Sequence, residues 1–221
     1  MENKRIFDIE LEKLNQKIIQ MCSQVNKQVK DAIAALKENN LDLAREVITI
    51  DNDINSLEVK IDKLCQKIFA LQQPVASDLR FIMSALKINN DLERIGDHAV
   101  SIAKRISALE DFPELVPSLG VSQVGDKVHE LFEIMLELVH NRNLNLNDEI
   151  FRQAATVKEE CRIVSDKILA EMMQKTEVIA VATILLEILN HTERIAGYIT
   201  NIAESITFVV EGEIIKHRKN Q

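Results

Sequence analysis

The chain has 221 residues, 46% hydrophobic and 28% charged, which is enough apolar material for one or two folded domains with a substantial core. Its net charge of −8 argues against binding to nucleic acid, which requires clustered lysine and arginine to displace counterions. Five Gly and three Pro are too few for the many turns of a sandwich or barrel, and three widely separated Cys do not form a thiolate metal motif.

The first half of the chain predicts three long helices. Apolar residues recur three and four positions apart, which is the pattern of helices packed along their length against one another. The first helix ends at Asn39-Asn40, the second begins at Leu41 and ends before Pro74, and the third runs to about Leu109. The apolar seam of the first helix is Leu14, Ile18, Met21, Val25, Ala32 and Leu36.

A second set of three helices is expected after residue 120. Residues 111–120 contain two Pro and a Gly, so we assign them as a linker between a first unit at 1–110 and a second unit at 121–221. Joined by short turns, the three helices of each unit must pack antiparallel. The predicted fold is therefore all-α, with two tandem three-helix bundles. The helices of the second unit are expected at 121–141, 148–175 and 176–210.

The two units are related by an internal duplication. Residues 86–97 align with residues 186–197 without a gap, and the tripeptide Glu-Arg-Ile coincides at 93–95 and 193–195. The agreement covers polar as well as apolar positions, which a shared helical period alone would not produce. We therefore expect a pseudo-twofold repeat.

Two acidic side chains lie on the third helix, on the face opposite its apolar seam. Glu93 and Asp97 are four positions apart, so their carboxylates are neighbours on one helical face. Like charges at that spacing destabilise a helix by about 0.2–0.5 kcal/mol. A hard cation would relieve this repulsion, because such ions bind several carboxylate oxygens.

The second helix carries a matching polar line. In an antiparallel hairpin around Pro74, Asp51 and Asp97 lie at the same height, since each is 23 residues from the proline. The pattern therefore predicts an oxygen-ligand metal site shared by the two helices. The members of the line on the second helix are Asp51, Asn55, Glu58 and Asp62.

Spacing alone leaves another interpretation open. Acidic residues on outer helix faces are mostly solvated, and Arg94 and Lys60 are placed to neutralise these as ordinary neighbours. Gly96 also has a purely structural explanation, because a glycine permits a close helix crossing at a cost of about 1 kcal/mol relative to alanine.

Four segments together resemble the PhoU family, the phosphate-transport regulatory proteins of bacteria and archaea. The first unit contains QPVASDLR at 73–80 and DLERIGDH at 91–98, and the second contains ERI at 193–195 and TNIAE at 200–204. The resemblance covers nearly the whole chain. It implies a pair of three-helix bundles related by pseudo-twofold symmetry.

The resemblance also implies a function and a set of partners. Such a protein is a cytoplasmic negative regulator of phosphate uptake and of the phosphate-starvation response. It acts as an adaptor between a phosphate ABC transporter and a sensor histidine kinase, as a homodimer. The membrane would be reached only through these partners at its inner face, because no apolar stretch here approaches the roughly 18 residues that span a bilayer.

Metal binding is a further implication of the resemblance. Family members carry a Glu/Asp-xxx-Asp motif in each repeat that holds metal clusters on the bundle surface. Glu93 and Asp97 match this motif fully, and Asp51 matches the start of the partner motif, with Asn55 where an aspartate is common. The family favours iron, and Zn, Mn, Mg and Ca are the other ions that these oxygen ligands suit.

The second unit departs from this motif. Glu193 is present, but Gly197 occupies the position of the second carboxylate. Either Glu159 or Glu160 corresponds to Asp51, and we take Glu160 together with Glu193 as the candidate ligands. We therefore expect one competent metal site in the first repeat and a degraded one in the second.

Two other functions compete with a metal-binding regulator. An enzyme of the di-iron carboxylate type requires paired Glu-x-x-His motifs facing the bundle core, and only Glu137 with His140 has that spacing. We expect no enzymatic activity. A purely structural or oligomerising bundle with solvated acids is the other alternative.

Three further side chains are candidate contacts for a partner protein. Asp78 and Arg80 follow Pro74, where they either form the start of the third helix or contact a partner. Arg94 is the third candidate.

Overall fold

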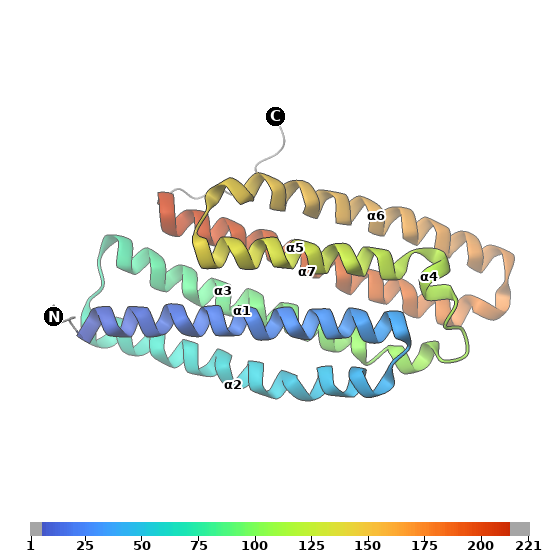
Figure 1. Cartoon of the computed structure of the whole chain (residues 1–221), viewed down its shortest axis with the longest axis horizontal. Helices are drawn as coiled ribbons and strands as arrows, with labels where there is room; N and C mark the ends of the chain where they lie inside the picture. Colours follow the sequence, from blue (N-terminus) through green and yellow to red (C-terminus); the bar gives the residue numbers. More distant parts are fainter. Residues whose placement is uncertain (1–5, 213–221) are drawn as a thin grey trace.

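The computed structural model describes residues 6–212, and within that range it contains helices and no strand. Helices α1 to α3 form one bundle and α5 to α7 form a second one alongside it (Figure 1). The predicted fold class is confirmed. The long helices are α1 (Ile6–Glu38), α2 (Leu41–Gln72), α3 (Ala76–Ala103), α5 (Val121–Asn141), α6 (Asn147–Gln174) and α7 (Ile179–Glu211). The short elements are α4 (Leu115–Leu119) and the 3₁₀ turns η1 (Ile106–Leu109), η2 (Leu144–Leu146) and η3 (Thr176–Val178).

Local sequence signals account for the start and the end of α2. The side chain of Asn40 accepts a hydrogen bond from the backbone N–H of Leu43 at 3.0 Å, which caps the start of α2. Gln73 closes α2 in the left-handed region, with φ of 45°, and Pro74 follows it. These residues turn the chain back so that α2 and α3 run antiparallel.

Helix α3 is shorter than the sequence predicted. It ends at Ala103, not near Leu109, and η1 follows it. Ile106 and Leu109 in this turn are almost fully buried, so the apolar spacing continues past the point where the helix stops. For that reason the hydrophobic pattern did not reveal the end of the helix.

The segment assigned as a linker packs onto the core. Within residues 111–120, α4 buries Leu115, Val116 and Leu119. Gly120 ends α4 with φ of 93°, a left-handed conformation that a residue with a Cβ rarely adopts. The division into units at 1–110 and 121–221 stays a prediction about the repeats.

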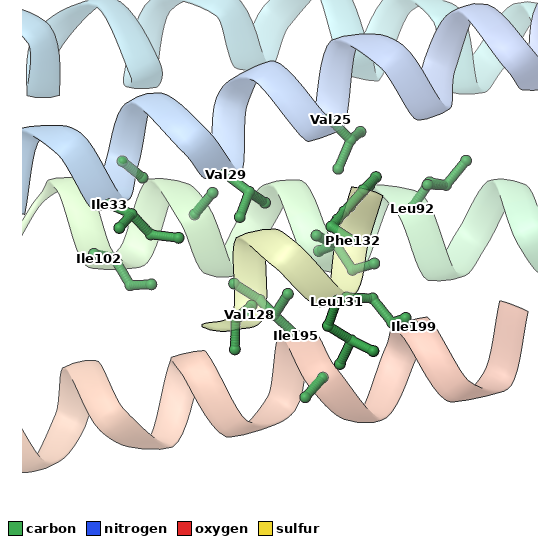
Figure 2. Close-up of a cluster of buried hydrophobic side chains, with 14 of the residues drawn as sticks. Val25, Val29, Ile33, Leu92, Ile102, Val128, Leu131, Phe132, Ile195 and Ile199 are labelled. Atoms are coloured by element: carbon green, nitrogen blue, oxygen red, sulfur yellow. The ribbon is translucent and has the colours of Figure 1, made fainter. Parts of the chain in front are cut away.

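Both bundles contribute to one continuous hydrophobic core. Figure 2 shows side chains from α1, α3, α5 and α7 turned toward a common interior. Phe132 of α5 is fully buried within it. The first and third helices of each repeat therefore form the centre, with α2 and α6 outside. The labelled residues are Val25, Val29, Ile33, Leu92, Ile102, Val128, Leu131, Phe132, Ile195 and Ile199.

A glycine permits the close approach of α1 and α5. A Cβ added to Gly125 would lie only 3.1 Å from Cγ2 and 3.3 Å from Cγ1 of Ile33. The side chain of Ile33 thus occupies the space that any larger residue at position 125 would need. This contact connects the first helices of the two repeats.

Polar pairs connect α3 and the turn after it to α7, the third helix of the second repeat. Arg105 Nε donates to Glu187 Oε2 at 2.6 Å, and the Nδ1 atoms of His98 and His191 lie 3.0 Å apart. Burial, together with His191 and Arg194, lowers the pKa of His98 to about 4. Both contacts cross between the bundles and add directional bonds to the apolar core.

In the part of the chain that the structure describes, no helix has both the length and the apolar character required to cross a membrane.

Truncating the shared core should destabilise both repeats together. We expect Phe132→Ala to lower the free energy of unfolding by about 3–5 kcal/mol, because it removes a fully buried aromatic ring and leaves a cavity. Met173→Ala, at a side chain that is 83% exposed, is the control and should change little. Urea unfolding followed by far-UV circular dichroism and by Tyr198 fluorescence should give one coincident transition. Two separated transitions would contradict the shared core.

Candidate metal centre

The acidic lines on α2 and α3 run side by side at the height that the hairpin predicted. A Cβ on Gly96 would lie 3.6 Å from Oδ1 of Asp51, so Asp51 of α2 lies against α3 at the height of Gly96, the residue before Asp97. Further along the pair, the amide of Asn89 donates to Oδ1 of Asp62 at 2.9 Å and to the carbonyl of Glu58 at 3.1 Å. These two contacts define the register of α2 against α3.

Asp51 is held between two amides. Its Oδ1 accepts a hydrogen bond from Nε2 of Gln28 at 3.2 Å, and its Oδ2 accepts one from Nδ2 of Asn55 at 3.0 Å. Asn55 therefore acts as a donor to Asp51 in this arrangement. Neither partner carries a positive charge, so neither one neutralises the Asp51 carboxylate.

Glu93 and Asp97 are close enough for their charges to interact. The pKa of Glu93 is raised, first by burial and then by the negative charges of Asp97 and Glu58. In the protein without a cation, the two acids of this motif therefore repel each other.

Arg94 is the cation closest to these acids in the described contacts. Its Nε lies 3.6 Å from Glu93, and its Nη1 lies 3.9 Å from Asp97. Both distances exceed a hydrogen bond, and the arginine side chain is 52% exposed. Arg94 therefore neutralises these acids only weakly, as a neighbour on a solvated helix face would.

Two further carboxylates belong to the same electrostatic group. Burial raises the pKa of Glu58, and the negative charges of Asp62 and Asp97 raise it further. The sequence placed Glu58 and Asp62 on the polar line but not among the candidate ligands. We define the acidic cluster as Glu58, Asp62, Glu93 and Asp97, with Arg94 beside it.

The acidic cluster fits a cation by its chemistry, although its side chains do not converge. Within residues 6–212, no three His, Cys, Asp or Glu side chains are grouped closely enough to hold a metal ion. The contacts give one reason, since both oxygens of Asp51 accept hydrogen bonds from amides. The donors are nevertheless all carboxylate oxygens, which suit a hard cation.

The candidate ligands of the second repeat have a different environment. Glu160 of α6 forms an ion pair with Lys127 of α5. Glu193 lies close enough to Cys161 that its charge, like that of Glu160, raises the pKa of that buried thiol after burial itself. Nothing lies within 4 Å of a Cβ built on Gly197, so the missing carboxylate leaves open space.

The candidate partner-binding residues have separate surroundings. Asp78 lies in the first turn of α3 and lines a pocket of about 360 Å³ that also includes Phe81 and Arg142. The guanidinium of Arg80 lies against Gly212, the residue that ends α7, with its carbon 3.5 Å from a Cβ built there. Arg80 is thus positioned where a cation is favourable near the carbonyl end of a helix.

The geometry does not support the di-iron alternative. Such a site needs its Glu-x-x-His side chains inside the bundle. Glu137 and His140 are both exposed on α5 and line a shallow surface pocket with Glu133.

Two partners of the candidate ligands could not be identified from the sequence. Gln28 donates a hydrogen bond to Asp51, and Lys127 forms an ion pair with Glu160. Gln28 is a polar residue within the apolar seam of α1, between Val25 and Ala32, and this interruption was the available signal. Nothing local to Lys127 indicates that Glu160 is its partner, because the two residues are on different helices.

Comparison with known proteins reveals the same repeat. A family model described as the PhoU domain matches residues 18–106 and, a second time, residues 121–206. Among curated proteins, the phosphate-specific transport system accessory protein PhoU of Edwardsiella tarda is 33% identical over 213 residues, which are 96% of this chain and 87% of that protein. Its counterpart in Escherichia coli K12 is also 33% identical, over 97% of this chain and 90% of that protein.

Solved structures have the same fold. The crystal structure of PhoU from Pseudomonas aeruginosa superposes with a TM-score of 0.87 at 32% identity, covering 94% of this chain and all (100%) of that one. The phosphate transport system regulatory protein PhoU from Streptococcus pneumoniae gives a TM-score of 0.85 at 28% identity, covering 96% of this chain and 100% of that one.

Removing the charge of Glu93 should stabilise the protein when metal is withheld. The pKa of Glu93 is raised from its ordinary 4.5, so the folded state holds its proton more tightly than the unfolded state does. Stability is therefore lost as the pH rises above about 4.5. In EDTA at pH 7 we expect Glu93→Gln to raise the free energy of unfolding by about 0.2–0.5 kcal/mol, a gain that disappears at pH 4.

Glu159→Gln is the matched control for this measurement. Glu159 is exposed, and Arg162 lowers its pKa, so the same substitution should not increase stability there. Urea titrations at both pH values provide the comparison. A loss of stability in Glu93→Gln at pH 7 would contradict the proposed repulsion.

Proposed function

The chain belongs to the PhoU family, and we propose that it is a negative regulator of phosphate uptake and of the phosphate-starvation response, working as an accessory protein of a phosphate-specific transport system. The observation that supports this is the double match to the PhoU domain, one in each bundle. The similarity to accessory proteins of that system extends over nearly the full chain. The protein acts in the cytoplasm.

In this proposal the protein is an adaptor. It contacts a phosphate ABC transporter on one side and a sensor histidine kinase on the other, and it forms a homodimer. The support is the asymmetry of the repeats, which share a fold but differ in surface chemistry. In the first repeat the acidic cluster is half-buried with Arg94 loosely beside it, whereas Glu160 of the second repeat is paired with Lys127. Asp78, Arg80 and Arg94 are the candidate contacts.

A metal ion is part of the proposed mechanism. The ligands are Asp51, Glu93 and Asp97, with Asn55 beside them, and iron is the ion that family resemblance favours. A bound cation would offset the repulsion between Glu93 and Asp97. Glu193 and Glu160 would bind metal poorly, because Lys127 already neutralises Glu160.

A structural or oligomerising bundle without a metal role is the second candidate. The observation that favours it is the loose contact of Arg94 with Glu93 and Asp97, which relieves part of the repulsion. The two functions differ in whether the protein retains metal.

Elemental analysis separates these two candidates. Protein purified without chelator or affinity metal should retain iron, or one of Zn, Mn, Mg and Ca. Asp97→Ala should lose it, because one of the two carboxylates of the motif is gone. Glu193→Ala is the matched control in the second repeat and should keep the wild-type content. Equal metal content in the wild type and in Asp97→Ala would contradict the metal role.

The regulatory role has its own test in cells. Deleting the gene should leave a phosphate-starvation reporter switched on in phosphate-rich medium, and the wild-type chain should switch it off again. Affinity capture of the chain should retain subunits of the phosphate ABC transporter and the sensor kinase. A reporter that responds normally in the deletion strain would contradict the proposed regulator.

A further inference from the structure

A buried amide of α1 lies beneath the acidic side chains of the first repeat. Gln28 is fully buried, with 0% exposure, and it contacts both other helices of its bundle. Its Nε2 donates to Oδ1 of Asp51 and to the backbone carbonyl of Val47, both at 3.2 Å. Two acceptors on α2 thus fix the orientation of the amide, with its NH₂ group toward α2.

The other end of this amide faces α3. Oε1 of Gln28 has no hydrogen-bond partner, and it lies 2.9 Å from the position of a Cβ built on Gly96. An alanine at 96 would therefore force this oxygen, at the end of the flexible Gln28 side chain, to move. Gly96 leaves space for the amide of Gln28, which explains the glycine more specifically than a close helix crossing does. In the aligned position of the second repeat, Ala196 is buried.

In the second repeat, the first helix contacts the acid of the outer helix through a charged side chain. Lys127 of α5 forms an ion pair with Glu160 of α6, so a positive charge cancels that carboxylate. Gln28 of α1 contributes only a neutral dipole to Asp51 of α2. A neutral donor orients a carboxylate and leaves its charge available, whereas a lysine competes with any cation.

We propose that Gln28 is a positioning residue of the first-repeat metal site, that it holds the Asp51 carboxylate against α3 without neutralising it, and that Gly96 is required to accommodate it. The inference rests on the proposed metal role of Asp51, Glu93 and Asp97. The side chain on the first helix, Gln28 or Lys127, therefore determines whether the carboxylate on the second helix is free to bind a cation. Gln28 itself does not contact the ion.

Three variants test this role. Gln28→Leu removes the amide but keeps an apolar volume in a buried site. Gln24→Leu makes the same change one turn earlier on α1, at a half-buried residue, and is the matched control. Gly96→Ala introduces the methyl group that would push the Gln28 amide away from Asp51. Titration calorimetry with Mn²⁺ measures affinity, and urea unfolding in EDTA measures the stability of the metal-free chain.

We expect Gln28→Leu and Gly96→Ala each to weaken Mn²⁺ binding 10- to 100-fold, the range typical of residues that orient a metal ligand. The unfolding midpoint of Gln28→Leu in EDTA should equal or exceed that of the wild type, because a buried unpaired oxygen is removed. Gln24→Leu should bind Mn²⁺ like the wild type. A merely structural role for Gln28 would change the midpoint and leave the affinity intact.

The outcomes separate this inference from the proposed function. If the wild type binds Mn²⁺ and Gln28→Leu binds it equally well, the positioning role is overturned and the metal role stands. If the wild type binds neither Mn²⁺ nor iron, the metal role itself is overturned. If Gln28→Leu does not fold, Gly96→Ala is the deciding variant. Unchanged Mn²⁺ affinity in Gly96→Ala would also overturn the inference.

Discussion

The apolar seam shared by α1, α3, α5 and α7 is the constraint on which the rest of the structure depends. These four helices place Phe132 and its neighbours in one core, and Gly125 lets α1 and α5 approach closely enough to close it. Because burial of this surface is the main favourable term in folding, the two repeats cannot separate without exposing it. The relative orientation of the repeats therefore follows from packing. The Arg105–Glu187 and His98–His191 contacts add directional polar interactions between them.

The same constraint leaves α2 and α6 on the outside. An outer helix buries one stripe and exposes the opposite face, so acids on its edge lie beside the third helix of the same bundle without entering the core. In the first repeat this position brings Asp51 against Gly96 and places Glu58 within the field of Asp97. The repulsion among these acids is thus a consequence of the architecture, and it is tolerated because the cluster stays partly hydrated.

The two repeats share one helical scaffold but differ in the charge beside the acid of the outer helix. The Glu-Arg-Ile segment recurs at 93–95 and 193–195, yet the acid on the neighbouring outer helix contacts a glutamine in one repeat and a lysine in the other. A single helical architecture accommodates both solutions, since neither Gln28 nor Lys127 alters the apolar seam beyond its own position. In the proposed regulator this difference gives the two repeats distinct surfaces.

The sequence by itself determined the number, type and approximate bounds of the long helices, the duplication, and the equal height of Asp51 and Asp97. Hydrophobic period, Asn40, Pro74 and the repeat spacing are all local signals. It did not determine the end of α3, because Ile106 and Leu109 remain buried after the helix stops. Tertiary structure alone decided which partner each acid has. Gln28 and Lys127 reach Asp51 and Glu160 from other helices, and such contacts depend on packing angles that no linear spacing encodes.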